Sequence, residues 1–122
     1  MAGGTAVVVG VGPGLGWSLV KRFARGGLSV VACARNPKKL EALAKTHGID
    51  ARLEACDATR REDVERVFAA AGSPSVAIFN AGAYERGGIL EISPEDFERC
   101  WRIGAFAGFL VGQAAARRMV PK

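Results

Sequence analysis

Residues 5–16 read Thr-Ala-Val-Val-Val-Gly-Val-Gly-Pro-Gly-Leu-Gly, the most informative stretch of the chain. A short apolar run breaks into glycines, and a helical pattern of apolar residues begins at Leu15. Glycines in such a turn let the backbone approach a pyrophosphate group closely, and the helix that follows offers unpaired N–H groups and its positive dipole end. The stretch therefore predicts a strand, a phosphate-binding turn and a helix, with an ordinary glycine turn as the alternative.

The spacing of the glycines narrows the kind of turn. Gly10, Gly14 and Gly16 give the pattern G-x-x-x-G-x-G. The pattern G-x-G-x-x-G fails when it begins at Gly10 or Gly12, because Leu15 or Trp17 stands where the last glycine would be. A P-loop is excluded because no Gly-Lys-Ser or Gly-Lys-Thr follows. The candidate ligand-binding residues of this turn are Gly10, Gly12, Pro13, Gly14, Leu15 and Gly16.

Strand and helix patterns alternate along the rest of the chain. Strands are expected over residues 6–9, 28–34, 51–56 and 76–79. Helices are expected over residues 15–25 and 61–71. Two further helices are expected, one from an Asn36-Pro37 cap to near Gly48 and one from a Ser93-Pro94 cap to about Met119. Alternation at this interval is typical of parallel βαβ units with right-handed crossovers. We expect an α/β fold with a parallel sheet of about four strands, in one domain over residues 1–122.

Length and composition limit the kinds of protein this chain can be. Its 122 residues suffice for one domain, and 49% of them are hydrophobic, as in a protein with a packed core. Three widely separated cysteines and a single histidine, His47, predict neither a disulfide framework nor a metal site. This cysteine usage predicts a reducing, cytoplasmic location, and no signal peptide or membrane-spanning stretch is visible.

The net charge of +5 raises the question of a polyanionic partner. The basic residues occur in scattered pairs, such as Lys21–Arg22 and Arg117–Arg118, beside helix ends or on exposed faces. The sequence has no basic run interleaved with aromatic residues, which binding of single-stranded nucleic acid requires. We therefore expect neither a nucleic-acid partner nor a membrane partner.

The end of the second expected strand carries a basic residue where a dinucleotide fold often has an acidic one. The sequence there is Cys33-Ala34-Arg35-Asn36, so no carboxylate is available for a free ribose 2′-OH. The planar guanidinium of Arg35 suits a 2′-phosphate, and Lys38 and Lys39 would strengthen the positive field. The alternative is a solvated basic start of the next helix.

Two further motifs follow the third and fourth expected strands. Asp57-Ala58 offers a carboxylate that can accept a hydrogen bond from an adenine amino group. The alternative is an ordinary cap for the next helix, and the two roles can coexist. Asn80-Ala81-Gly82 offers small residues against which a ribose can lie, or simply a turn. Since the carboxyl ends of parallel strands share one edge of a sheet, these residues belong to the same candidate site as the glycine turn.

Taken in order, these motifs resemble the short-chain dehydrogenase/reductase family over nearly the whole chain. The resemblance rests on the G-x-x-x-G-x-G turn, on Arg35, on Asp57-Ala58 and on Asn80-Ala81-Gly82, and residues 96–103 resemble the start of the family's long interface helix. It implies a Rossmann-like, doubly wound sheet with its strands in the order 3-2-1-4. It also implies hydride transfer between a nicotinamide and an alcohol or carbonyl carbon. With Arg35 in place, it implies NADP(H) as the preferred cofactor, with NAD as the alternative.

The sequence departs from the family pattern in three ways. Val9 stands where a threonine commonly precedes the first glycine, and Gly104 aligns with the asparagine of the family's proton relay. The family's catalytic serine and its Tyr-x-x-x-Lys pair are both missing. The only tyrosine is Tyr84, and the residue four places later is Gly88 instead of lysine. No catalytic residue is therefore assigned in this chain.

We expect the chain to be the cofactor-binding, N-terminal half of a short-chain oxidoreductase about twice as long, inactive by itself. A small alcohol or carbonyl substrate is expected only for the full-length form. The alternative is a non-catalytic module that binds a dinucleotide as a sensor or scaffold. An exposed apolar edge on the fourth strand would favour association, so we expect a homo-oligomer.

Overall fold

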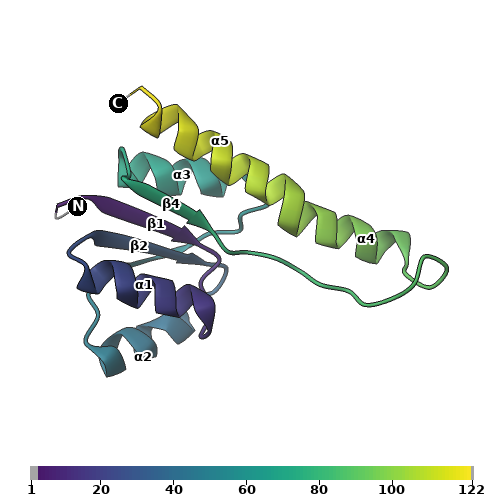
Figure 1. Ribbon diagram of the computed structural model, residues 1–122, viewed down its shortest axis with the longest axis horizontal. Helices are drawn as coiled ribbons and strands as arrows, with labels where there is room; N and C mark the ends of the chain where they lie inside the picture. The colour runs from purple at the N-terminus through teal and green to yellow at the C-terminus, as the bar shows by residue number, and fades with distance from the viewer. Residues whose placement is uncertain (1–2, 122) are drawn as a thin grey trace.

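Four parallel strands form one sheet in the computed structural model, which describes residues 3–121 (Figure 1). The strands are β1 (Thr5–Val9), β2 (Ser29–Ala34), β3 (Arg52–Ala55) and β4 (Val76–Phe79). They lie in the order β3-β2-β1-β4, which confirms the predicted topology. The first three expected strands differ from the observed ones by a residue at one or both ends.

The two central strands are buried on both faces, which explains their unbroken apolar sequences. Val7 pairs with Val31 of β2 on one side and with Ala77 of β4 on the other. Its side chain belongs to the core on one face of the sheet, whereas the side chains of Ala6 and Val8 belong to the core on the opposite face. Residues that alternate between two cores must all be apolar.

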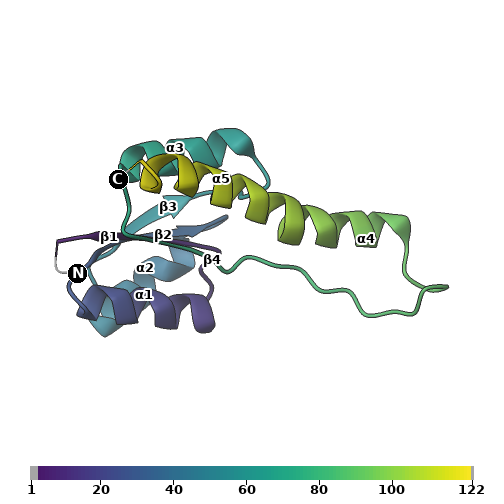
Figure 2. The ribbon, with the colours of Figure 1, turned by 45° about the horizontal axis from the view of Figure 1, so that its top comes forward.

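Helices cover both faces of the sheet, so the molecule has three layers (Figure 2). One layer consists of α1 (Leu15–Arg25) and α2 (Lys38–His47), and the other of α3 (Arg61–Ala71) and α5 (Ala107–Met119). Trp17 and Leu40 anchor the first layer, and Phe68 and Val111 anchor the second. The sheet is thereby held rigidly, and its carboxyl ends form a fixed edge.

The predicted helix ends are mostly confirmed. The N–H of Asp96 donates to Ser93 Oγ at 3.1 Å, so Ser93 caps α4 (Pro94–Trp101). Gly48 ends α2 with a left-handed φ of +63°, where glycine is favoured. The expected cap at Asn36 is displaced by one residue, because Pro37 directly precedes α2. The Asn36 side chain still accepts a hydrogen bond, from the Lys38 N–H at 3.2 Å.

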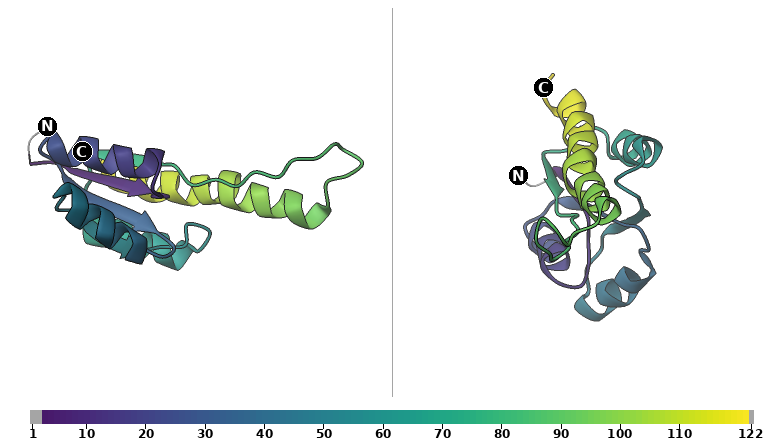
Figure 3. Two further views of the ribbon diagram at one scale, coloured as in Figure 1. Left: turned by 90° about the horizontal axis from the view of Figure 1, so that it is seen from below. Right: turned by 90° about the vertical axis from the view of Figure 1, so that its right-hand side faces the viewer.

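The long helix expected from Ser93 to about Met119 is not a single α-helix. A π-helical turn, η1 (Arg102–Phe106), separates α4 from α5. Figures 1 and 3 show that α4 and the coil before it extend together beyond the sheet as an arm. An ion pair between Arg99 and Glu85 ties the two parts of this arm to each other.

Within residues 3–121, no helix combines the length and the apolar character that crossing a bilayer would need.

Candidate functional site

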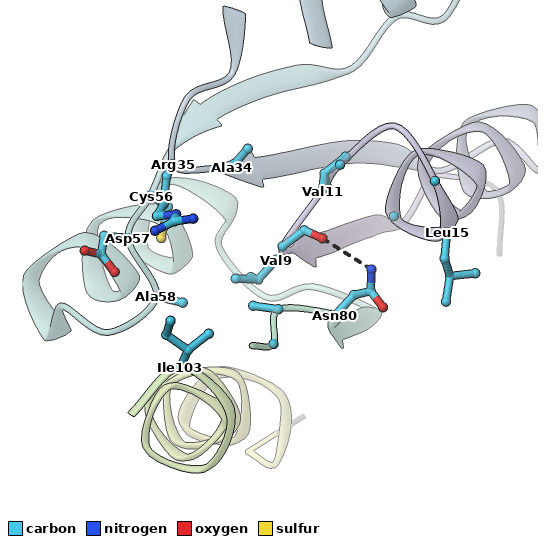
Figure 4. A pocket seen from close by; sticks show the side chains of 16 residues that line it. Val9, Val11, Leu15, Ala34, Arg35, Cys56, Asp57, Ala58, Asn80 and Ile103 are labelled. Carbon is cyan, nitrogen blue, oxygen red and sulfur yellow. Dashed lines mark hydrogen bonds between the residues drawn. The ribbon is translucent and has the colours of Figure 1, made fainter. Parts of the chain in front are cut away.

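A pocket of about 420 Å³ lies at the carboxyl ends of the strands (Figure 4). After β1 the chain adds β2 and β3 on one side of β1, and it then crosses back to add β4 on the other side of β1. The connections at the carboxyl ends of β1 and β4 therefore diverge, which opens a crevice at that edge of the sheet. The lining residues are Val9, Gly10, Val11, Gly12, Gly14, Leu15, Gly16, Ala34, Arg35, Cys56, Asp57, Ala58, Asn80, Ala81, Gly82 and Ile103. Loops after all four strands therefore contribute to one site.

Eleven of the twelve residues predicted from the sequence line this pocket. The exception is Pro13, which lines a neighbouring cavity of about 300 Å³ together with Lys39 and Leu40. Five lining residues are not predicted from the sequence. Four of them are direct neighbours in the sequence of predicted residues, so the sequence motifs indicate the segments to which they belong. The fifth, Ile103, comes from η1 and carries no local motif.

The glycines of the first turn fall into two groups. A Cβ on Gly10 would lie 2.4 Å from the Ala81 N, and a Cβ on Gly16 would lie 2.9 Å from both the Gly10 carbonyl O and the Val11 Cα. These two glycines are required by the packing of the chain itself. A Cβ on Gly12 or Gly14 would meet nothing within 4 Å, although both residues line the pocket. Gly12 and Gly14 therefore leave space next to the backbone in which a ligand can lie.

Hydrogen bonds hold the glycine turn in place between β1 and α1. The N–H groups of Gly10 and Val11 donate to the Cys33 carbonyl at 3.0 and 2.9 Å. The Asn80 side chain donates from Nδ2 to the Gly10 carbonyl at 3.3 Å, which joins the ends of β1 and β4. The amide of Trp17 donates to the Gly12 carbonyl at 3.0 Å, so the turn leads directly into the helix.

The start of α1 favours a negatively charged ligand. The first amides of a helix have no intrahelical acceptor, and the helix dipole is positive at this end. No acidic side chain occupies the first turn of α1 to neutralise it. Leu15, the first helical residue, is exposed and lines the pocket. An anion in the pocket would therefore be stabilised by the backbone of Gly14 and Leu15.

Arg35 and Asp57 gather at the opposite end of the pocket from Leu15 (Figure 4). Asp57 Oδ1 accepts hydrogen bonds from the N–H of Thr59 at 3.0 Å and from its Oγ1 at 2.7 Å. The side-chain bond from Thr59 is the main cause of the lowered pKa of Asp57, helped by the backbone bond and by the charges of Arg35 and Arg60. The carboxylate is therefore ionised at neutral pH.

The alternative role of Asp57 as a helix cap is wrong. The residue before α3 is Arg60, and the Asp57 carboxylate closes a turn with Thr59 instead of accepting from the first turn of the helix. Asp63 reaches back from α3, where its Oδ2 accepts the Asp57 N–H at 2.9 Å. This support fixes the loop after β3 while leaving Asp57 on the pocket wall.

Asp57 is expected to contribute a small stabilisation that disappears in acid. Because its pKa is lower in the folded state, the contribution is present at neutral pH and is lost as the pH falls through the folded pKa. Since the carboxylate is partly exposed to solvent, the contribution should be below about 1 kcal/mol. Urea unfolding of the original chain and of Asp57→Asn, from about pH 7 to about pH 3, measures it. The difference between the two should shrink on acidification, and a constant difference would contradict the assignment.

The two buried cysteines, Cys33 and Cys56, have unreactive thiols. Burial raises the pKa of Cys33 to about 12 and that of Cys56 to about 11. Both therefore remain thiols at neutral pH, although Cys56 lines the pocket, and neither is a nucleophile. Among the residues that the structure describes, no group of three or more metal-ligating side chains comes together.

The positions that depart from the family pattern lie as follows. Tyr84 is on the arm, 81% exposed, and does not line the pocket. Gly104 lies in η1, and a Cβ there would meet nothing within 4 Å, so the space for a larger side chain is present. Its neighbour Ile103 contributes an apolar side chain to the pocket lining, next to Ala58 (Figure 4).

A parallel sheet with helices on both faces, and with a glycine-lined pocket where the strand order reverses, defines a Rossmann-like domain. The chain belongs to the short-chain dehydrogenase family, whose profile, described as short chain dehydrogenase, matches residues 4–122. The resemblance inferred from the motifs is thereby confirmed.

The relatives show what fraction of a family member's length this chain spans. The gluconate 5-dehydrogenase of Gluconobacter oxydans is 33% identical over the whole chain, which spans 50% of that protein. A short-chain dehydrogenase structure from Rhodopseudomonas palustris is 33% identical with a TM-score of 0.83, covering 96% of this chain and 58% of that one. The structure of BdcA in complex with NADPH is 28% identical with a TM-score of 0.85, covering 98% and 48%. The chain spans about half the length of the relatives it matches.

Proposed function

We propose that this chain binds NADP(H) in the pocket at the carboxyl ends of its strands, as the cofactor-binding portion of a short-chain oxidoreductase. The observation that carries the proposal is the open space above Gly12 and Gly14, between the start of α1 and Arg35. Packing within the chain does not explain glycine at these two positions, whereas a ligand close to the backbone does. BdcA, a relative of the same fold, was solved with NADPH.

Each part of the pocket suits a different part of the dinucleotide. The turn at Gly12–Leu15 and the amides of α1 would hold the pyrophosphate. Arg35 would hold the 2′-phosphate, and the ionised Asp57 would accept from the adenine amino group. Asn80-Ala81-Gly82 would lie along the ribose of the nicotinamide. When bound, the nicotinamide supplies a carbon that gives or takes a hydride.

The chain's own residues bind and orient but do not supply an acid for the carbonyl oxygen. Ser93 caps α4, and Tyr84 lies exposed in the coil before α4 and does not line the pocket. We therefore propose that the chain alone is inactive, and that the small alcohol or carbonyl substrate belongs to a longer form. Gly104, with unused space around it, supports the second candidate, a dinucleotide-binding module without catalysis.

Gly12→Asp is expected to weaken NADPH binding by about tenfold or more without unfolding the chain. The new side chain would meet no protein atom at Cβ, so the fold should tolerate it. Its carboxylate would enter the same space as the cofactor phosphates, and a repulsion of about 1.4 kcal/mol corresponds to a factor of ten. Calorimetric titration with NADPH measures the affinity, and thermal unfolding checks the fold.

Gly12→Asn is the matched control, because asparagine has nearly the same shape without the charge. It should bind NADPH clearly more tightly than Gly12→Asp, and the gap should narrow at high salt. Equal affinities in the two variants would show that no phosphate lies near this position. Failure of the unchanged chain to bind NADPH at all would refute the proposed function.

We also propose that the protein is a cytoplasmic homo-oligomer. No strand among residues 3–121 pairs with the outer edge of β4, and Phe97, Trp101 and Phe109 are exposed along α4 and α5. An open edge and an apolar helix face both favour association. Light scattering after size exclusion should therefore give a mass of two or more chains. A monodisperse single chain at the same concentration would contradict this expectation.

A further inference from the structure

The whole surplus of positive charge lies in one continuous part of the sequence. Residues 11–50 hold seven lysines and arginines against two acidic residues, whereas the rest of the chain holds ten of each. The net charge of +5 is therefore the charge of this segment, which forms the glycine turn, α1, β2 and α2. The molecule is electrostatically divided, with one positive helical layer and an otherwise neutral remainder.

Ion pairing follows the same division. Three basic residues lie on α1, namely Lys21, Arg22 and Arg25, and four lie on or just before α2, namely Arg35, Lys38, Lys39 and Lys45. Within residues 3–121, none of these seven makes a salt bridge. Of the nine described arginines outside this segment, by contrast, six make a salt bridge, and Arg117 and Arg118 both pair with Glu65. The other three are Arg60, Arg61 and Arg86. The positive layer is left uncompensated.

This layer borders the pocket directly. Arg35 lines the pocket, and Lys39 lines the neighbouring cavity, which shares Val11 and Gly12 with it. Figure 2 shows α1 and α2 side by side on one face of the sheet, and both begin at the edge that carries the pocket. A positive field that covers this layer therefore extends to the pocket mouth.

We infer that the α1–α2 layer steers polyanionic dinucleotides into the pocket, with cations beyond the contact residues raising the association rate. The inference rests on the proposed function. NADPH carries roughly four negative charges, about two of them on its phosphate monoester. A fixed positive field of this kind raises association rates by about tenfold or more and weakens steeply with ionic strength. The layer should therefore favour capture of NADPH over NADH, which lacks the monoester.

Remote cations can act only while the field is unscreened. The Debye length is about 30 Å at 0.01 M salt and about 8 Å at 0.15 M. Arg22 in the last turn of α1 and Lys45 in the last turn of α2 do not line either cavity. Their contribution to the association rate should therefore be visible at low salt and vanish at high salt, whereas a direct contact would persist.

The test is stopped-flow binding of NADPH to the unchanged chain and to the double variant Arg22→Gln/Lys45→Gln. At about 0.01 M salt the variant should associate about threefold more slowly with the same dissociation rate, and at about 0.3 M salt the two should agree. The control is Arg86→Gln/Arg117→Gln, which removes the same charge from the neutral part of the molecule and should change the rate less.

Three results would overturn the inference. Equal association rates for the chain and the α1–α2 variant at low salt would refute steering while leaving NADPH binding intact. An equal slowing in the control would show that net charge, rather than its place on α1 and α2, sets the rate. Absence of NADPH binding to the unchanged chain would refute the proposed function and the inference together.

Discussion

Replacing Arg35 with aspartate is expected to reverse the cofactor preference, so that the chain binds NADH more tightly than NADPH. Arg35 lines the pocket at the end of β2 and makes no salt bridge within residues 3–121 that would compete for its guanidinium. The substitution removes a bidentate phosphate partner and adds a carboxylate that repels the phosphate and can accept from a ribose 2′-OH. Together these changes should alter the ratio of the two dissociation constants by about 100-fold, or about 2.7 kcal/mol.

The measurement is a pair of calorimetric titrations, with NADPH and with NADH, on the original chain and on Arg35→Asp. Arg86→Asp is the matched control, because it makes the same change of charge on the arm, away from the pocket. The control should keep the preference for NADPH. A ratio unchanged by Arg35→Asp would mean that the 2′-phosphate does not lie at the end of β2.

The second large effect concerns stability, where Gly10→Ala is expected to prevent stable folding. Gly10 has a φ of +93°, and a Cβ there would lie 2.4 Å from the Ala81 backbone N. The contact is with backbone at the junction of β1 and β4, so no side chain can move aside to relieve it. We expect a loss of about 4 kcal/mol or more in the free energy of unfolding.

Gly48→Ala separates the two causes of this loss. Gly48 also has a positive φ, of +63°, but a Cβ there would meet nothing within 4 Å. Its substitution should cost only about 1 kcal/mol, from backbone conformation alone. Urea unfolding followed by circular dichroism compares the two variants. A similar cost in both would show that close approach of the two loops does not matter for stability.

The motifs that could be predicted from the sequence are those set by local chemistry. Apolar runs of strand length, alternating with helical patterns, indicate parallel βαβ units, and the family resemblance of the motifs implies the order of the strands. The Ser93 cap was equally predictable, since a hydroxyl three residues before an N–H acts within one helical turn. For the same reason, eleven of the twelve candidate residues come together around one pocket.

The features that could not be predicted depend on packing between distant segments. Residues 102–106 contain no proline and are apolar enough for an ordinary helix, yet the structure forms a π-helical turn there. That turn contributes Ile103 to the pocket wall, and no local pattern marks it. Pro13 faces the neighbouring cavity because the glycine turn lies between two spaces, and sequence alone does not indicate which one each residue lines.

The most direct test of the account is to map, residue by residue, where NADPH binds to this chain. Amide chemical shifts recorded during a titration should change at residues 10–12 and 14–16, at Arg35, at residues 57–58 and at residues 80–82. The cavity at the other end of the sheet, lined by Thr5, Ser29, Asp50 and Arg52, serves as an internal control and should not respond. Shift changes centred on that second cavity, or no changes at saturating NADPH, would contradict the assignment of the cofactor site.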